Sequence, residues 1–192
     1  GFQASLRSRG TNLPIGPRCP LRIDTLQRPL IVAAIMASIN TIAVIGSGSV
    51  GCYYGARLAQ HFDVSFLMRR DLATVRRNGL SIRSVAGDFH LEEVKAFGST
   101  DEIGPVDLVI IALKTTSNSI LPETVAPLLK PGTILLTLQN GLGNEDFLRA
   151  AFPHHPILGG LCFVCINRGE PGVIHHLAHG RVEMGEFTDT RV

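Results

Sequence analysis

The sequence has few cysteines, no long hydrophobic run and almost no net charge. Its four cysteines, at positions 19, 52, 162 and 165, are too few and too scattered for a disulfide framework in a chain of 192 residues, which favours a reducing compartment. The longest apolar run near the N-terminus, residues 30–39, is about half of the ~20 residues that a membrane helix needs. We therefore expect a cytoplasmic protein that does not act at a membrane.

The excess of basic residues is confined to the N-terminus, and the rest of the chain is nearly neutral. Residues 1–40 hold five arginines and one acid, so 13 of the 18 basic and 15 of the 16 acidic residues lie beyond them. Nothing in this balance predicts a nucleic-acid-binding face. The hydrophobic fraction of 45% is ordinary for a globular protein and sufficient for one sizeable core.

The first 35 residues are rich in arginine, poor in acids and interrupted by four prolines, with neither helical nor strand periodicity. We interpret Met36 as the natural start and residues 1–38 as a disordered leader or a non-native extension. Two alternatives remain open: a transit peptide, with organellar import through residues 1–35, or a short signal sequence with 30–39 as its apolar part. In each case the folded domain is expected over residues 39–190.

From residue 41, apolar strand-like runs alternate with helical segments. The strands are expected at 41–46, 63–68, 107–113 and 133–139, and the helices at 49–62, 71–79, 116–130 and 143–152. A small hairpin over 80–85 and 89–97 and short strands at 156–166, 172–178 and 181–187 complete the pattern. The alternation predicts an α/β, Rossmann-like domain, with a mainly parallel sheet and helices on both faces.

A glycine-rich loop, IAVIGSGSVG, joins the first strand to the first helix at G-x-G-x-x-G spacing. In this motif the first glycine makes the tight turn, the second leaves room for a pyrophosphate and the third lets the helix pack close to the sheet. The free N–H groups of the helix then face the phosphates. We therefore predict a dinucleotide site that contains Gly46, Ser47, Gly48, Ser49, Val50 and Gly51.

The run VSFLMRRD, residues 64–71, ends an apolar strand on two adjacent arginines. In the NAD-binding version of this fold an acid at this strand end binds the ribose 2′-hydroxyl, whereas an arginine accommodates the 2′-phosphate of NADP. Arg69 lies 23 residues after Gly46, Arg70 can add charge or stack on the adenine, and Asp71 is expected to cap the next helix. This chemistry predicts NADP(H) as the cofactor; the alternative is a pair of solvated arginines.

Two more polar residues, Lys114 and Asn140, follow the third and fourth apolar strands. Because the carboxyl ends of parallel strands lie at one edge of a sheet, where ligands bind, both are expected to converge with Gly46 and Arg69 on one rim. Taken singly, Lys114 is an ordinary loop lysine and Asn140 an ordinary Asn-Gly turn. Their joint placement predicts that both bind cofactor and substrate.

These motifs resemble those of the ketopantoate reductases (2-dehydropantoate 2-reductases) over residues 41–187. The resemblance rests on the glycine loop, the arginine after the second strand, ALKTTSN around Lys114 and LQNGLGNED around Asn140. It also rests on GGLCFVCINRGEPGVIHHLAHGRVEMGE near the end. Many dehydrogenases share the glycine loop, whereas the pairing of LK with LQNGLGNE is more particular to this family.

The resemblance implies an oxidoreductase that uses NADPH to reduce a small keto acid, 2-dehydropantoate, to pantoate, a step toward pantothenate and coenzyme A. In the family, the residues matching Lys114 and Asn140 approach the nicotinamide and the keto acid, so here they would orient substrate and cofactor. The cofactor carries out the hydride transfer itself, and the protein supplies alignment and charge.

The sequence departs from the family pattern in one respect. The family's proton-donating lysine and substrate-binding glutamate lie in a second, mostly helical domain, and this chain ends at Val192, where that domain would begin. We therefore assign no catalytic residue in this chain, and we expect a truncated, inactive cofactor-binding portion. A non-catalytic dinucleotide-binding sensor or interaction module is the alternative.

A zinc module is a third hypothesis, because Cys162, Cys165, His175 and His179 follow the spacing C-x2-C-x9-H-x3-H. Residues three apart in a strand point to opposite faces, so the two cysteines would not converge on one ion. We instead expect core cysteines and histidines at the rim, and no metal site.

Overall fold

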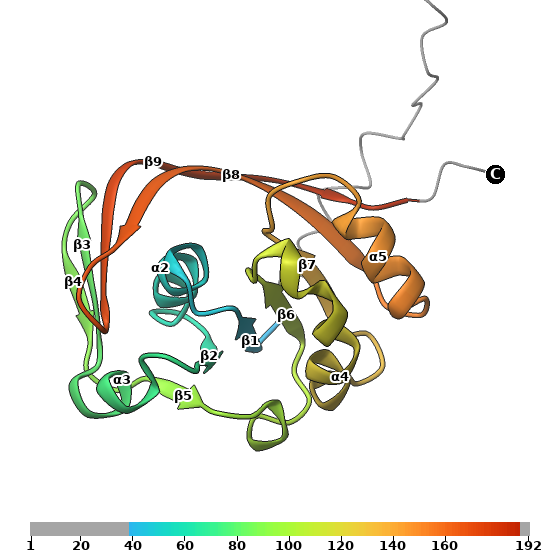
Figure 1. Cartoon of the computed structure of the whole chain (residues 1–192), viewed down its shortest axis with the longest axis horizontal. Coiled ribbons are helices and arrows are strands. Elements are labelled where there is room, and N and C mark those ends of the chain that lie inside the picture. The colour runs from blue at the N-terminus through green and yellow to red at the C-terminus, as the bar shows by residue number, and fades with distance from the viewer. Residues whose placement is uncertain (1–38, 189–192) are drawn as a thin grey trace, which may run out of the picture. The chain divides into compact units, whose positions relative to one another are not determined.

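The structure, a computed structural model, describes residues 39–188 (Figure 1). The leader or extension predicted for residues 1–38 lies outside the described residues and stays a prediction, as does the end of the domain at residue 190. None of the helices within residues 39–188 is long and apolar enough to cross a membrane.

Strands and helices alternate along the described residues as the sequence pattern predicts. The strands are β1 (Thr41–Ile45), β2 (Asp63–Leu67), β3 (Leu80–Ser84), β4 (Phe89–Leu91), β5 (Lys95–Phe97), β6 (Leu108–Ile111), β7 (Ile134–Thr137), β8 (Ile157–Arg168) and β9 (Val173–Glu186). The α-helices are α2 (Ser49–Leu58), α3 (Leu72–Asn78), α4 (Leu121–Val125) and α5 (Asn144–Ala151). Short 3-10 helices are η1 (Thr100–Glu102), η2 (Thr115–Ile120) and η3 (Ala126–Leu128).

The strands form one mixed sheet in the order β4-β3-β9-β8-β7-β6-β1-β2-β5. From β8 through β7, β6, β1 and β2 to β5 all neighbours are parallel, and so is the pair β3–β9. Among the described strands only β3–β4 and β8–β9 are antiparallel. The predicted mainly parallel, Rossmann-like α/β sheet is confirmed.

The central strands are apolar on both faces because helices cover both faces. Val44 of β1 belongs to a core cluster with Ala56 of α2, whereas its neighbour Ala43 belongs to a second cluster with Leu121 of α4 and Leu148 of α5. In Figure 1, α2 lies inside the curve of the sheet, β8 and β9 arch over it, and α4 and α5 lie on the other side. The sheet thus curves around α2, with β3 and β4 on one side of the helix and β1 on the other.

The stretch 89–97 is two strands rather than the single strand predicted. β4 pairs with β3, as expected for a hairpin, but β5 pairs in parallel with β2 at the opposite edge of the sheet. Glu92 and Glu93, both exposed, separate them. Two successive charged residues favour solvent over a place in the ladder, which explains the break.

The helix predicted over 116–130 is instead three short pieces, η2, α4 and η3. Pro122 and Pro127 each occupy one of the first two positions of a new piece, where the missing proline N–H leaves no intrahelical hydrogen bond unmade. A new segment thus begins one residue before each proline. The helix predicted over 49–62 also ends earlier, at Leu58.

The short strands predicted after residue 156 are joined into one long hairpin, β8–β9. Its register shifts twice, between Phe163 and Val164 and between Cys165 and Ile166, so β9 contains bulges. At one bulge His179 and Gly180 have φ values of 65° and 116°. The left-handed backbone there absorbs the extra residue, so β9 continues where two separate strands, 172–178 and 181–187, were predicted.

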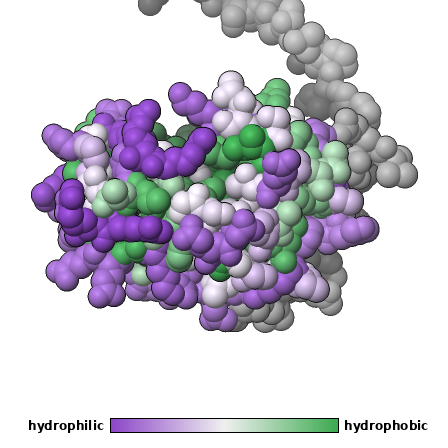
Figure 2. Space-filling model, turned by 60° about the horizontal axis from the view of Figure 1, so that its bottom comes forward, coloured by the Kyte–Doolittle hydropathy of each residue, from purple (hydrophilic) through white to green (hydrophobic). Residues whose placement is uncertain are grey.

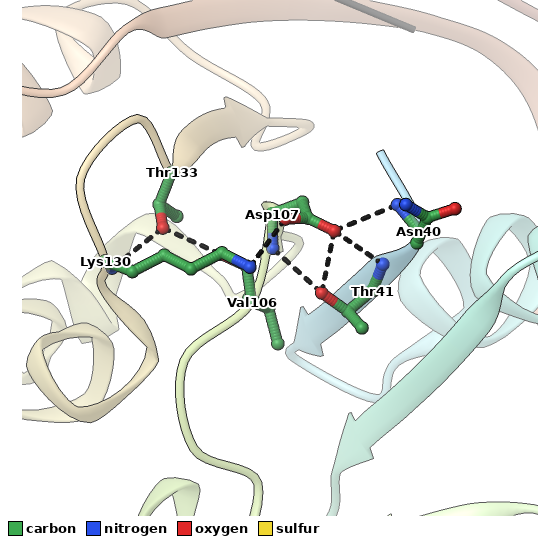
Figure 3. Close-up of polar contacts among 6 residues, drawn as sticks. All are labelled: Asn40, Thr41, Val106, Asp107, Lys130 and Thr133. Atoms are coloured by element: carbon green, nitrogen blue, oxygen red, sulfur yellow. Dashed lines mark hydrogen bonds and ion pairs between the residues drawn. The ribbon is translucent and has the colours of Figure 1, made fainter. Parts of the chain in front are cut away.

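The amino ends of β1, β6 and β7 are fastened by one carboxylate (Figure 3). Asp107 Oδ2 accepts hydrogen bonds from the backbone nitrogens of Asn40 and Thr41, both at 2.9 Å, and Asp107 Oδ1 lies 2.6 Å from Lys130 Nζ. Lys130, followed by those backbone N–H donors, holds the pKa of Asp107 well below its ordinary value of 3.8. This cluster lies at the edge opposite the strand ends where ligands bind in such folds.

Candidate functional site

A cavity of about 650 Å³ lies at the carboxyl ends of the parallel strands. Residues that follow β1, β2, β5 and β6 line it, together with the first turn of α2 and the turn between β8 and β9. The predicted site residues in its lining are Gly46, Ser47, Gly48, Ser49, Arg69, Arg70 and Lys114. Since α/β sheets bind ligands at this edge, this cavity is the candidate site.

The glycine loop has a different steric requirement at each glycine. Gly46 has a φ of +100°, and a Cβ there would lie 2.5 Å from the backbone nitrogen of Leu113. A Cβ on Gly51 would lie 2.1 Å from the Gly46 carbonyl oxygen, so the helix can approach the loop only without a side chain. A Cβ on Gly48, in contrast, would meet no atom of the described chain within 4 Å. The loop is therefore open to the cavity at Gly48.

The first turn of α2 offers N–H groups to the same cavity. Its N-cap residue, Gly48, makes no side-chain cap hydrogen bond, and the first turn holds no acid. The Ser47 hydroxyl donates to the Leu67 carbonyl oxygen and so ties the loop to the end of β2. Val50 packs against the core cluster instead of lining the cavity, and Gly51 is buried. An uncapped helix N-terminus beside an open glycine favours an anion.

Arg69 and Arg70 are exposed at the end of β2 and line the cavity. Neither has a hydrogen-bond or ion-pair partner among the described residues. They also line a shallow hollow with Arg76 and Arg77 of α3, on the side of the molecule where Figure 2 shows the most hydrophilic side chains. Two unpaired guanidinium groups at a cavity mouth are suited to bind phosphate oxygens.

Asp71 does not cap α3, contrary to the sequence prediction. It occupies the N-cap position, but its side chain makes no cap hydrogen bond. Its Oδ2 instead lies 2.5 Å from Arg168 Nη2 and accepts a hydrogen bond from the backbone nitrogen of Gly172 at 3.4 Å. Asp71 is thus bound to the β8–β9 turn, and both Asp71 and Arg168 line the cavity.

Lys114 and Asn140 lie at the ends of the neighbouring strands β6 and β7, as expected. Lys114 is exposed and lines the cavity. Asn140 is exposed as well, but it is not part of the cavity lining. Of the four groups predicted to converge, the cavity therefore joins those at Gly46, Arg69 and Lys114.

A network of amide side chains connects the loops that carry Lys114 and Asn140. Gln139 Nε2 donates to Asn118 Oδ1 at 2.8 Å and to the Leu113 carbonyl oxygen at 3.1 Å. Asn118 Nδ2 donates to Asn144 Oδ1 at 3.2 Å, and Asn144 Nδ2 donates to the Asn140 carbonyl oxygen at 3.3 Å. The network, which the sequence prediction missed, holds the two loops in a fixed relation.

The comparison with known proteins agrees with this arrangement. Residues 42–189 match the family model described as "Ketopantoate reductase PanE/ApbA". The chain belongs to the ketopantoate reductase family. The resemblance found in the motifs is thereby confirmed.

Individual known proteins match about three quarters of this chain. A 2-dehydropantoate 2-reductase from Nostoc sp. is 42% identical over 76% of this chain and 46% of its own length. The uncharacterized oxidoreductase YkpB of Bacillus subtilis is 36% identical over 77% of this chain and 49% of its own length. The crystal structure of a 2-dehydropantoate 2-reductase from Geobacter metallireducens GS-15 has 48% identity and a TM-score of 0.75, covering 79% of this chain and 51% of that one. The chain spans about half the length of these relatives.

The cysteines of this chain are arranged differently from the prediction. Cys52 is buried in α2, as expected, but Cys162 is only half-buried and Cys165 is exposed, so the description of both as core residues is wrong for Cys165. Cys162 packs toward the core cluster and Cys165 faces outward. Within residues 39–188 no group of three or more His, Cys, Asp or Glu side chains is placed to hold a metal ion.

Proposed function

We propose that this chain binds NADP(H) and serves, within a ketopantoate reductase, the reduction of 2-dehydropantoate to pantoate. The observation that carries the proposal is the shared cavity: the open Gly48, the uncapped start of α2 and two unpaired arginines all line it. A dinucleotide with a 2′-phosphate has one anionic group for the helix and another for the arginines.

The residues present fit such a cofactor. The pyrophosphate would lie against Gly48, where a side chain would otherwise fill the space, and would accept hydrogen bonds from the N–H groups at the start of α2. Arg69 and Arg70 would bind the 2′-phosphate. When bound, the nicotinamide supplies the hydride, and the chain supplies position and charge.

A preference for NADP(H) over NAD(H) follows from the charges at the end of β2. A carboxylate free to bind the ribose 2′-hydroxyl is the usual basis of NAD binding. Here the arginines line the cavity without partners among the described residues, whereas Asp71, the acid in the described cavity lining, is engaged by Arg168. The local charge therefore favours a phosphate.

Lys114 and Asn140 are proposed to orient the keto acid and the nicotinamide. The Lys114 ammonium, at the cavity wall, is suited to attract the substrate carboxylate and to stabilise the developing alkoxide. Asn140 lies beyond the cavity lining on the next strand end, so we place it nearer the substrate than the cofactor phosphates. We assign no proton donor among residues 39–188.

A fluorescence titration of the whole chain with NADPH and NADH tests the proposal. We expect NADPH to bind at least about tenfold more tightly, a difference of about 1.4 kcal/mol, because one more charged group is engaged. Arg69→Ala should remove most of this preference. Arg181→Ala is the matched control, since Arg181 is exposed on β9 and lies outside the cavity lining. Equal affinity for the two cofactors before mutation would contradict the proposal.

An assay with 2-dehydropantoate and NADPH separates the enzyme from its alternative. Tight NADPH binding whose affinity rises in the presence of 2-dehydropantoate supports the reductase assignment. Tight NADPH binding that is indifferent to the keto acid would instead support a non-catalytic dinucleotide-binding module.

A further inference from the structure

A buried carboxylate lies next to the two arginines that are proposed to bind the 2′-phosphate. Asp71 follows Arg69 and Arg70 directly, and its side chain is 9% exposed, whereas both arginines are exposed. All three residues line the same cavity. A negative charge so near would weaken the binding of a phosphate dianion unless something neutralises it.

Arg168 is the residue placed to do so. Its Nη2 lies 2.5 Å from Asp71 Oδ2, and its side chain is 30% exposed against 9% for Asp71, so the carboxylate is the shielded member of the pair. Arg168 is the last residue of β8, 97 residues away in the sequence, and the backbone nitrogen of Gly172 in the following turn donates to the same carboxylate oxygen. The carboxylate is thus turned toward the β8–β9 turn.

The charges of this pair act on the cavity wall. Burial raises the pKa of the Cys52 thiol to about 12, and the two charges act on it in opposite directions, Arg168 lowering the pKa and Asp71 raising it. Cys52 lies near the start of α2 and lines the cavity. Removing either charge would therefore change the electrostatic potential at the cavity wall, where the cofactor is proposed to bind.

We propose that Arg168 determines cofactor specificity from a distance, as a positioning residue that keeps Asp71 neutralised and away from the ribose. The inference rests on the proposed NADP(H) binding. Without Arg168 the carboxylate would lose its partner and would turn toward the solvent-filled cavity, where it would accept a hydrogen bond from the ribose 2′-hydroxyl. Asp71 would then act as the acid does in NAD-binding relatives of this fold, repelling a 2′-phosphate and hydrogen-bonding a free 2′-hydroxyl.

The test is a double-mutant cycle on the ratio of the dissociation constants of NADH and NADPH. Arg168→Met should lower this ratio by about fivefold or more, mainly through weaker NADPH binding, since two unit charges a few ångströms apart in water interact by about 1 kcal/mol. Asp71→Asn combined with Arg168→Met should return the ratio to within about twofold of the wild-type value, because no carboxylate remains. Asp71→Asn alone should not lower it.

The controls separate this role from a structural one. Arg181→Met breaks the exposed ion pair with Glu183 on β9, 2.8 Å long, and should leave the ratio unchanged. If Arg168→Met does not fold, Arg168→Gln, which keeps a donor but removes the charge, should lower the ratio in the same direction. Circular dichroism establishes that each variant is folded at the temperature of the titration.

Two results overturn the inference. Equal weakening of NADPH and NADH by Arg168→Met would mean that Arg168 only stabilises the fold, and a double variant that keeps the ratio of Arg168→Met would mean that Asp71 is not involved. Both are distinguishable from a failure of the proposed function, in which the wild-type chain itself would show no preference for NADPH.

Discussion

At the scale of single residues, the candidate site depends on where a side chain has room. Gly48 and Gly51 belong to the same motif, but a Cβ on Gly51 would meet a backbone oxygen at 2.1 Å and one on Gly48 would meet nothing within 4 Å of the described chain. Only Gly51 is required by packing. Gly48 leaves space that the fold itself does not use, and that space is available to a ligand.

Two alanine variants should therefore behave in opposite ways. Gly51→Ala should lower the free energy of unfolding by about 1–3 kcal/mol, because the helix must move away from the loop. Gly48→Ala should cost less than about 1 kcal/mol, since Gly48 has an ordinary φ of −78°, but it should weaken NADPH binding. Urea unfolding and fluorescence titration measure the two effects. Unchanged NADPH affinity in folded Gly48→Ala would show that the pyrophosphate does not lie at Gly48.

The positions of the glycine loop and the arginine pair at the ends of β1 and β2 were predictable, because they depend on residues close in the sequence. The spacing of the glycines follows from contacts within one strand–turn–helix unit. The orientation of Asp71 was not predictable, because its partner Arg168 lies 97 residues further along the chain. From the neighbouring sequence, a helix cap was the expected role of Asp71. In the structure its side chain pairs with the distant Arg168 instead.

At the scale of elements, two loops on neighbouring strand ends are held together by side-chain amides. Asn118 is central, since it accepts from Gln139 and donates to Asn144. Gln139 and Asn144 are both buried, so each needs a partner. The relation between the loops of Lys114 and Asn140 therefore depends on η2, which carries Asn118.

Asn118→Ala should loosen both loops together. We expect a loss of about 1–2 kcal/mol in the free energy of unfolding, because two buried amide groups each lose a hydrogen bond. Binding of 2-dehydropantoate should weaken more than binding of NADPH, since the arginines and the glycine loop are not disturbed. Unfolding in urea and calorimetric titration measure these changes.

The matched control is Asn167→Ala, an exposed asparagine on β8, which should change stability by less than about 0.5 kcal/mol. An Asn118→Ala protein with wild-type stability and ligand affinities would contradict the role given to the network.

The elements themselves were predictable where the pattern was strongly apolar and less so elsewhere. β1, β2, β6 and β7 lie within one or two residues of the expected ranges. For β1, β6 and β7 the reason is that strands buried on both faces are continuously apolar. The prediction over 116–130 missed the division into η2, α4 and η3, because Pro122 and Pro127 lie near the start of separate helical pieces. The β8–β9 hairpin was predicted as three shorter strands, because the sequence does not indicate that a bulge lets β9 continue through residues 179–180.

At the scale of the whole molecule, the carboxyl and amino ends of the parallel strands carry different features. The carboxyl ends carry the cavity, whereas the amino ends of β1, β6 and β7 are joined by Asp107 and Lys130. The Asp107 side chain is 21% exposed, and the carboxylate accepts its hydrogen bonds as a charged group. Stability should therefore depend on its ionisation.

The sign of this dependence follows from the lowered pKa. Because the folded state keeps Asp107 ionised at a pH where the unfolded chain is protonated, the contribution to stability is fully present above about pH 4 and is lost as the pH falls through the folded-state pKa. Asp107→Asn should cost about 2 kcal/mol at pH 7. The difference between variant and wild type should shrink as the pH falls from about 4 to about 2.

Urea unfolding of both proteins at several pH values measures this difference. Glu92→Gln, at an exposed acid, should change stability by less than about 0.5 kcal/mol throughout. A penalty for Asp107→Asn that stays constant down to pH 2 would rule out the ionisation of Asp107 as its source.

The overall class of the molecule was predictable from the alternation of strands and helices, but its strand order was not. Parallel pairing around β1 follows from the connection lengths. The pairing of β3 with β9 joins residue 81 to residue 173, and no local pattern indicates it. Such distant pairing is decided by the packing of both strands against α2.

The pairing of β3 with β9 also constrains the order of events during synthesis. When β3 leaves the ribosome it has only the three residues of β4 beside it, and its other flank stays bare until residues 173–176 have been made. At ordinary translation rates of about 5–20 residues per second, that interval is several seconds. During this time the nascent chain exposes an unprotected strand edge, which is the period when a chaperone would be most useful to it.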